Sequence, residues 1–286
     1  MPRYDLRVPA NLSETLALLA EPGPAWRPFA GGTDLMVLLE AGKLPHTRYV
    51  SLWGLAALTG TLVSDDEVVL GALTTYAEIR GHHLLAAEFP LLVAAARETG
   101  GIATQNRGTI GGNIANASPA ADTPPALLVY DASLDLVSAR GRRQVPYAGF
   151  HTGYKTMDLG ADELIAAVRL PRLRRWTHQD YRKVGTRRAQ AIAKVCFAGA
   201  LAIDDGVVTD ARLAFGSVAP TSLRAIHAEA AIRGQRLDAT TIAAADAALA
   251  GDIAPIDDVR STARYRSTVA VNVMKSFLTG AGATGS

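Results

Sequence analysis

The chain is 286 residues long, 49% of its residues are hydrophobic, and its 29 basic residues nearly balance 27 acidic ones. This length predicts about two domains and is sufficient to bury a substantial core. The balanced charge, without a basic run, argues against nucleic acid as a partner, and no uninterrupted apolar stretch is long enough to span a membrane. The first residues show no apolar signal core, so we expect a cytoplasmic protein.

Residues that commonly bind metals are few. Cys196 is the only cysteine, which excludes an intramolecular disulfide and a cysteine-based metal site within this chain. It lies in an apolar run, where a buried and inert thiol is expected. The six histidines do not have the spacing of zinc ligands on a helix. The sequence therefore predicts no metal site.

The first half of the chain mixes short helices with strands. Asn11 and Glu14 have the spacing of a helix-capping pair, and the apolar residues that follow predict a helix over 12–19. Thr75 and Glu78 form a second candidate capping box. Further elements are predicted as a hairpin at 61–70, a helix from Pro90 to Arg97, an apolar helix at 126–130, and strands at 134–137 and 164–170.

Composition shifts near residues 172–180, which we take as a domain boundary. Beyond it, strands at 194–203 and 207–215 flank the turn sequence Asp204-Asp205-Gly206 and predict a small antiparallel sheet. Helical stretches follow at 222–232, 240–250 and 261–278. Strands followed by helices favour an α+β arrangement, and the glycine-rich end of the chain predicts a disordered tail at 281–286.

Two glycine-rich segments, at residues 30–35 and 108–122, are expected to be loops and are the candidate binding sites. Glycine lets the backbone approach a ligand closely and expose several N–H donors to one anion. Two such segments would suit a diphosphate, with threonine, asparagine and serine side chains as further partners. Neither segment has the P-loop or Rossmann fingerprint. Alternatively, each could be only a tight turn.

At these residues the sequence resembles the FAD-binding medium subunit of the xanthine dehydrogenase family, the molybdenum hydroxylases. This family includes carbon monoxide, nicotine and aldehyde dehydrogenases. The resemblance begins with Ala30-Gly31-Gly32-Thr33-Asp34-Leu35 and Thr109-Ile110-Gly111-Gly112-Asn113, and it continues through Asp122 to residues 153–156, 162–165 and 181–183. It therefore spans nearly the whole chain.

The resemblance implies an α+β fold, with a two-part FAD-binding fold of the p-cresol methylhydroxylase type and a small C-terminal domain of antiparallel sheet and helices. The FAD-binding domain would span 1–175 and divide near residue 57, and the C-terminal domain would span 176–280. By the same resemblance, the FAD pyrophosphate and ribityl chain would contact Phe29, Ala30, Gly31, Gly32, Thr33, Asp34, Leu35, Thr109, Ile110, Gly111, Gly112 and Asn113.

The resemblance gives three more residues a place beside FAD. Asp122 would bond the FAD hydroxyls, Ile165 would pack by the isoalloxazine ring, and Lys183 would approach from the C-terminal domain. Lys155 stands where relatives often carry arginine, which keeps the charge but loses the planar fork. A positive charge from Lys155 or Lys183 near the ring would raise the flavin reduction potential. No side chain is expected to act as a general acid or base.

In such an enzyme the electrons would come from [2Fe–2S] clusters and pass through FAD to NAD⁺ or another acceptor. One cysteine cannot hold a cluster of the Cys₄ type, so the resemblance implies partner subunits. These would be a large subunit with the molybdopterin cofactor and a small subunit with the [2Fe–2S] clusters, in a heterohexamer of two heterotrimers.

Two alternatives remain at this point. The chain could be a self-sufficient flavoprotein oxidoreductase of the p-cresol methylhydroxylase type, although it offers no evident tyrosine and histidine acid–base pair. It could also be a non-catalytic nucleotide-binding or scaffold module, which a purified protein that stays colourless after addition of FAD would favour.

Overall fold

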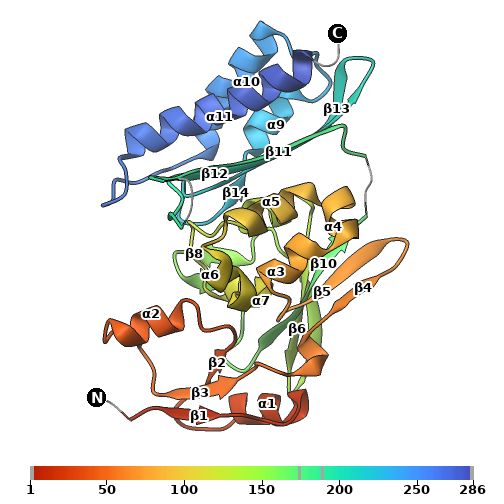
Figure 1. Ribbon diagram of the computed structural model, residues 1–286. Helices are drawn as coiled ribbons and strands as arrows, with labels where there is room; N and C mark the ends of the chain where they lie inside the picture. Colours follow the sequence, from red (N-terminus) through yellow and green to blue (C-terminus); the bar gives the residue numbers. More distant parts are fainter. Residues whose placement is uncertain (1–2, 173–174, 188–189, 284–286) are drawn as a thin grey trace.

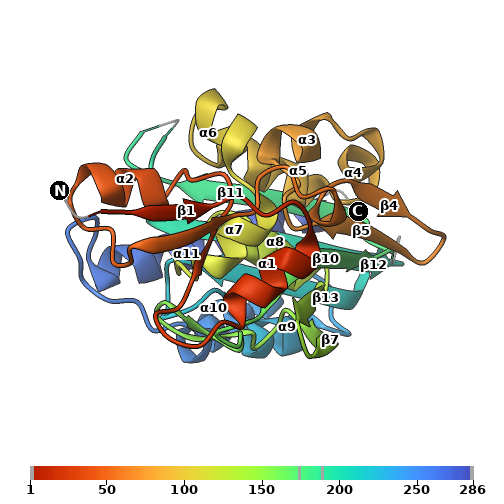
Figure 2. The same cartoon turned by 90° about the horizontal axis from the view of Figure 1, so that it is seen from below.

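The computed structural model describes residues 3–172, 175–187 and 190–283. Three parts follow one another along the chain, each built around its own sheet (Figure 1). Figure 2, which views the molecule from below, shows β1 and α1 of the first part nearest to the viewer.

The first part is a three-stranded parallel sheet in the order β1-β3-β2. Parallel neighbours cannot be joined by a tight turn, and each connection here contains a helix. The strands and helices, in chain order, are β1 (Asp5–Arg7), α1 (Leu12–Leu19), β2 (Arg27–Phe29), α2 (Leu35–Glu40) and β3 (Arg48–Ser51). Leu19, Trp26, Val50 and Leu52 are buried in its core. The short η1 turn (Ala56–Leu58) leads into the second part.

The second part is a five-stranded antiparallel sheet in the order β4-β5-β10-β6-β7, with β10 at its centre. Its strands are β4 (Thr61–Val63), β5 (Glu67–Gly71), β6 (Ser133–Ser138), β7 (Gly141–Pro146) and β10 (Leu164–Pro171), with the small hairpin β8 (His151–Gly153) and β9 (Thr156–Met157) beside them. Its helices are α3 (Tyr76–Gly81), α4 (His83–Glu88), α5 (Pro90–Glu98), α6 (Ile102–Arg107), α7 (Ile110–Ala115) and α8 (Pro124–Val129). Apolar side chains of helices and sheet form one core.

The third part is an antiparallel sheet covered on both faces. Its strands are β11 (His178–Val184), β12 (Val195–Asp204), β13 (Val207–Gly216) and β14 (Leu223–Arg224), followed by the helices α9 (Ile226–Ile232), α10 (Ala239–Asp252) and α11 (Ala263–Ala283). Along β12, Phe197 and Leu201 join the core under these three helices, whereas Ala198 and Ala200 join the core of the second part. Alternation along the strand therefore gives β12 a bulky face and a small-residue face, and the small residues let α8 pack closely, while α5 packs against the neighbouring strand β11.

The capping signals of the sequence are confirmed. The Asn11 side chain accepts a hydrogen bond from the Glu14 N–H at 2.9 Å. Thr75 and Glu78 form a reciprocal box, in which the Thr75 hydroxyl accepts from the Glu78 N–H and the Glu78 carboxylate accepts from the Thr75 N–H. The helix at Pro90, the hairpin at 61–70 and the two long strands around the turn at 204–206 are also present. Cys196 is fully buried, as expected.

Three predictions of local structure were wrong. The helix expected from residue 222 begins only at Ile226, because Leu223 and Arg224 pair with β13. Part of the second glycine-rich segment, expected to be a loop, is the helix α7. The predicted disordered tail is helical as far as Ala283, and Ala281 is buried against the C-terminal core. Residues 284–286 of that tail lie outside the described residues.

Candidate functional site

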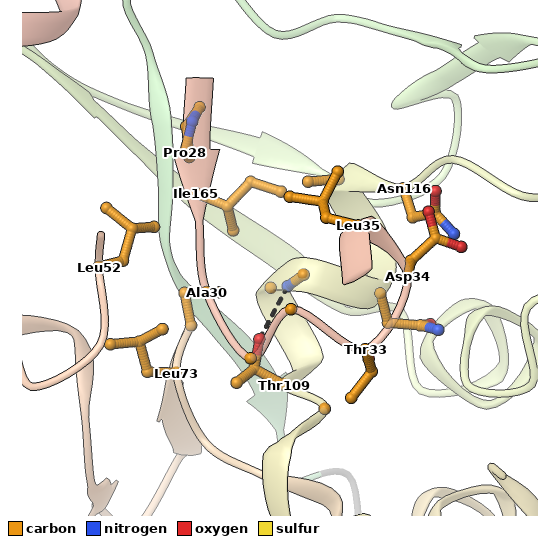
Figure 3. Close-up of a pocket in the computed structure, with 18 of the residues that line it drawn as sticks. Pro28, Ala30, Thr33, Asp34, Leu35, Leu52, Leu73, Thr109, Asn116 and Ile165 are labelled. Atoms are coloured by element: carbon orange, nitrogen blue, oxygen red, sulfur yellow. Dashed lines mark hydrogen bonds between the residues drawn. The ribbon is translucent and has the colours of Figure 1, made fainter. Parts of the chain in front are cut away.

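The two glycine-rich segments meet at one cavity, between the first and second parts of the chain. Residues 30–34 lead from β2 into α2, and α7 begins opposite them after Thr109, whose hydroxyl accepts from the Gly112 N–H (Figure 3). A Cβ on Gly31 would lie 1.7 Å from the Arg107 carbonyl oxygen, so only glycine permits this approach of the two backbones.

The first glycine segment presents a row of unused hydrogen-bond donors. Within residues 3–172, 175–187 and 190–283, the backbone N–H groups of Gly31, Gly32, Thr33 and Asp34 have no acceptor. Gly32 has a φ of +75°, a conformation that glycine adopts readily. Consecutive free N–H groups of this kind form a site for an anion.

The second glycine segment was expected to offer free N–H groups to an anion, but its N–H groups are already hydrogen-bonded within the protein. The N–H groups of Ile110, Gly111, Gly112 and Asn113 all donate within the protein, to Thr74, Ala72 and Thr109. A Cβ on Gly111 would lie 2.6 Å from that of Ala72. The second segment thus contributes the surface of α7 and its side chains to the cavity, while most of the free N–H groups come from the first segment.

The rest of the cavity wall is largely apolar. Leu52, Leu73 and Ala30 lie at one side of it, and Ile165 projects from the central strand β10 (Figure 3). Asp34 and Asn116 lie close together at the other side. The cavity therefore has a polar end next to the free N–H groups and an apolar wall, which suits a ligand with an anionic group and a flat apolar portion.

Lys155 supports one edge of the cavity. It lies in the β8–β9 hairpin with a φ of +59°, and its Nζ donates to the Asn116 carbonyl oxygen at 2.8 Å and to Asn116 Oδ1 at 2.5 Å. Burial lowers the pKa of Lys155, and the nearby Asp34 carboxylate opposes this effect. The structure thus places Lys155 on Asn116, a cavity residue at the end of α7.

Asp122 and Lys183 form a buried ion pair between the second and third parts. Lys183 Nζ lies 2.8 Å from Asp122 Oδ2 and also donates to the Glu98 carbonyl oxygen. Burial raises the pKa of Asp122 to about 6, although the charge of Lys183 lowers it. Among the described residues, Asp122 Oδ1 has no hydrogen-bond partner although it is buried, and such an acceptor has the capacity to bind a hydroxyl group.

Most of the predicted site residues line the cavity, and four do not. The four are Phe29, Ile110, Asp122 and Lys183. Phe29 lies next to Gly32 and stacks edge-on with Tyr49, and Ile110 is fully buried in the core. The residues that do line it are Ala30, Gly31, Gly32, Thr33, Asp34, Leu35, Thr109, Gly111, Gly112, Asn113 and Ile165.

Sequence reasoning missed three polar residues of the cavity, Tyr76, Asn116 and Glu163. Glu163 lies in the segment 162–165 that carries part of the resemblance, but only Ile165 was selected from it. Tyr76 is 3% exposed and immediately follows the capping residue Thr75, which forms an isolated β-bridge with Thr109. The capping box signals the start of α3, but a pairing between residues 34 positions apart leaves no local signal. Asn116 lies inside the second glycine segment, and only its neighbours were selected.

In the part of the chain that the structure describes, no group of three or more histidine, cysteine, aspartate or glutamate side chains is arranged to hold a metal ion. No helix within those residues has the length and hydropathy needed to cross a membrane.

Comparison with known protein families covers almost all of the chain. Residues 2–173 match the family described as the FAD-binding domain in molybdopterin dehydrogenase, and residues 180–281 match the CO dehydrogenase flavoprotein C-terminal domain. The xanthine dehydrogenase FAD-binding subunit of Escherichia coli O157:H7 is 33% identical over 259 residues, which cover 90% of this chain and 88% of that protein. The carbon monoxide dehydrogenase medium chain of Hydrogenophaga pseudoflava is 29% identical over 281 residues, covering 98% and 97% of the two chains.

Solved structures agree with the sequence relatives. A carbon monoxide dehydrogenase from Hydrogenophaga pseudoflava, which lacks the Mo-pyranopterin moiety of its molybdenum cofactor, matches with a TM-score of 0.93 at 30% identity over 97% of this chain and 96% of that chain. Quinoline 2-oxidoreductase from Pseudomonas putida 86 matches with a TM-score of 0.91 at 26% identity over 99% and 98%.

These matches confirm the predicted α+β fold, with a FAD-binding domain followed by a separate C-terminal domain. Relatives named as medium chains or as a subunit of a dehydrogenase complex are components of multi-subunit enzymes. The chain therefore belongs to the family of FAD-binding medium subunits of the molybdenum hydroxylases, which are oxidoreductases.

Proposed function

We propose that the chain binds FAD in the cavity between its first and second parts, receives electrons from a partner's [2Fe–2S] clusters and delivers them to NAD⁺ or another acceptor. The observation that carries this proposal is the row of four N–H groups, from Gly31 to Asp34, which have no acceptor among the described residues and lie at the polar end of a cavity with one apolar wall. A diphosphate has the charge and the spread of oxygens to use such a row.

Different residues of the chain would bind different portions of FAD. The free N–H groups would hold the pyrophosphate, and Thr109 would fix the start of α7 against it. Ile165 and the leucines of the apolar wall would cover a face of the ring and exclude water. By the family resemblance Asp122 would bond a FAD hydroxyl; it does not line the cavity itself, but its buried Oδ1 has no partner among the described residues. When bound, FAD supplies the redox chemistry, for which no side chain here is required as acid or base.

The electron donor must lie in another polypeptide. With one cysteine, fully buried, the chain cannot hold an iron–sulfur cluster of its own. We infer a heterotrimer with a molybdopterin-binding large subunit and a [2Fe–2S] small subunit, paired into a heterohexamer. The membership of its relatives in multi-subunit dehydrogenases supports this assembly.

Gly112→Val tests the FAD site. Gly112 is an exposed helical glycine whose Cβ would lie 2.9 Å from Thr109 Oγ1 and 3.9 Å from the Ala30 Cβ, between the two glycine segments. We expect the side chain to fill the cavity and to weaken FAD binding about tenfold or more. The measurement is a titration of the FAD-free full-length chain with FAD, followed by flavin fluorescence.

Gly251→Val is the matched control, because Gly251 is also an exposed helical glycine but has no atom within 4 Å of its Cβ position. Its FAD affinity should equal that of the wild type. Equal affinities for both variants would place FAD elsewhere on the molecule, and a wild-type chain that binds no FAD would refute the proposed function.

A further inference from the structure

Tyr76 is held at the inner wall of the cavity by the backbone around it. Its N–H donates to the Gly108 carbonyl oxygen at 3.2 Å, and the capping box of Thr75 and Glu78 fixes the first turn of α3. The tyrosine ring lies so close to Gly108 that a Cβ there would be 2.6 Å from Tyr76 Cε2. The ring therefore packs directly against the backbone at the start of the second glycine segment.

Two polar residues near Tyr76, Thr123 and Asn113, are joined by a hydrogen bond. The hydroxyl of Thr123, which is fully buried, donates to Asn113 Oδ1 at 2.6 Å. This bond fixes the Asn113 amide, and the Asn113 side chain partly opposes the rise that burial causes in the pKa of Tyr76. Asparagine carries its acceptor and its donors on one planar group, so binding at one end orients the other.

The hydrogen of the Tyr76 hydroxyl remains available to the cavity. Burial and the nearby Asp122 charge raise the pKa of Tyr76, so the hydroxyl keeps this hydrogen at neutral pH. In residues 3–172, 175–187 and 190–283, no atom accepts a hydrogen bond from it. A buried hydroxyl donor normally has an acceptor, and the cavity is the space that Tyr76 lines.

We propose that Tyr76 is a further FAD-binding residue, which donates its hydroxyl hydrogen to an oxygen of the pyrophosphate–ribityl portion and is oriented by the Thr123–Asn113 pair. This inference rests on the proposed function. The oxygen-rich portion is the one that fits, because Tyr76 packs on Gly108, and the backbone of Gly31, the first residue with a free N–H group, also closely approaches Gly108. A neutral donor there adds no charge, so its contribution to binding is insensitive to salt.

Tyr76→Phe removes the hydroxyl and keeps the ring. We expect the FAD dissociation constant of the full-length chain to rise about tenfold, equally at low and high salt, since each tenfold step corresponds to about 1.4 kcal/mol. Thr123→Val, which preserves shape but releases the Asn113 amide, should raise the same constant about threefold. Both are measured by fluorescence titration of FAD-free protein, with the melting temperature of each variant recorded alongside.

Tyr130→Phe is the matched control. Tyr130 is equally buried, but its hydroxyl accepts from the Leu91 N–H and donates to Gln179 Oε1, outside the cavity. This variant should melt at a lower temperature and bind FAD like the wild type. A dissociation constant within twofold of wild type for Tyr76→Phe would overturn the inference. If that variant does not fold, an unchanged constant for Thr123→Val would overturn it. Failure of the wild type itself to bind FAD would refute the proposed function instead.

Discussion

At the residue scale, Asp122 shows how burial sets the behaviour of a single group. Its Oδ2 atom pairs with Lys183, and its buried Oδ1 atom has no hydrogen-bond partner among the described residues. Desolvation exceeds the attraction of the lysine, and the pKa of Asp122 rises from 3.8 to about 6. A carboxyl group with this pKa changes its charge close to neutral pH.

The raised pKa of Asp122 makes the stability of the protein depend on pH. The folded chain holds the Asp122 proton more tightly than the unfolded chain, so protonation stabilises the fold. This contribution is fully present below about pH 4 and is lost as the pH rises through about 6. We expect the melting temperature of the wild type, relative to that of Asp122→Asn, to fall across this interval. If the melting temperatures of the two proteins change by the same amount between pH 4 and 7, the raised pKa of Asp122 does not control this pH dependence.

At the scale of elements, α3 and α7 begin side by side. Thr75 is the N-cap of α3, Thr109 is the N-cap of α7, and the two residues form an isolated antiparallel bridge. The Ile110 N–H donates to the Thr74 carbonyl oxygen, and the Tyr76 N–H donates to that of Gly108. Each helix start therefore fixes the other, and both face the cavity.

Thr75→Ala should destabilise this pair of helix starts. The substitution removes the hydroxyl that accepts from the Glu78 N–H, and loss of such a cap costs about 1 kcal/mol. We expect the midpoint of thermal unfolding to fall by a few degrees. Thr75→Ser, which keeps the hydroxyl, is the control and should unfold near the wild-type temperature. An alanine variant as stable as the serine variant would show that the box contributes nothing.

At the scale of the whole molecule, polar contacts join the C-terminal domain to the rest of the chain. Asp131 pairs with Arg212 and Arg224 at 3.3 and 3.1 Å, and it is partly exposed. The Asp122–Lys183 pair is nearly inaccessible to solvent, with side chains 9% and 5% exposed. Exposed pairs contribute little to stability, whereas breaking a buried pair leaves an uncompensated charge. The buried pair therefore matters more to the junction.

Lys183→Met tests this junction. We expect a loss of up to about 3–5 kcal/mol in stability near neutral pH, because without its cation Asp122 must either remain a buried charge or take up a proton as its pKa rises further. The double variant Asp122→Asn with Lys183→Met should recover much of that loss, since it buries no charge. Denaturant unfolding of the three proteins measures both effects. A double variant no more stable than Lys183→Met would refute this explanation.

The same variant addresses the proposed electrostatic role of Lys183. If its charge acts on the flavin ring, the reduction potential of bound FAD should be lower in Lys183→Met than in the wild type, because a nearby cation favours added electrons. A redox titration of the FAD-loaded protein measures this potential. An unchanged potential together with an unchanged FAD affinity would leave Lys183 with a purely structural part at the junction.

Local signals in the sequence determined many of the elements. Asn11 with Glu14, Thr75 with Glu78 and Pro90 act within one helical turn, so their neighbours in sequence suffice to set the helix starts. The turn at Asp205 and Gly206, both with positive φ, joins its two strands for the same reason. The glycine motifs also led, by resemblance, to the family and its cofactor. The domain limits near residues 57 and 175 remain predictions.

Only the tertiary structure decided how the site is assembled. Leu223 and Arg224 form a strand because they pair with the edge of β13. The N–H groups at the start of α7 donate to Ala72, Thr74 and Thr109, so they are not available to a ligand. Tyr76 lines the cavity because its neighbour Thr75 forms a β-bridge with the distant Thr109. Asp122 pairs with Lys183, which is 61 positions away in the sequence. Pairings of this kind depend on how separate elements pack, so neither periodicity nor a local motif contains them.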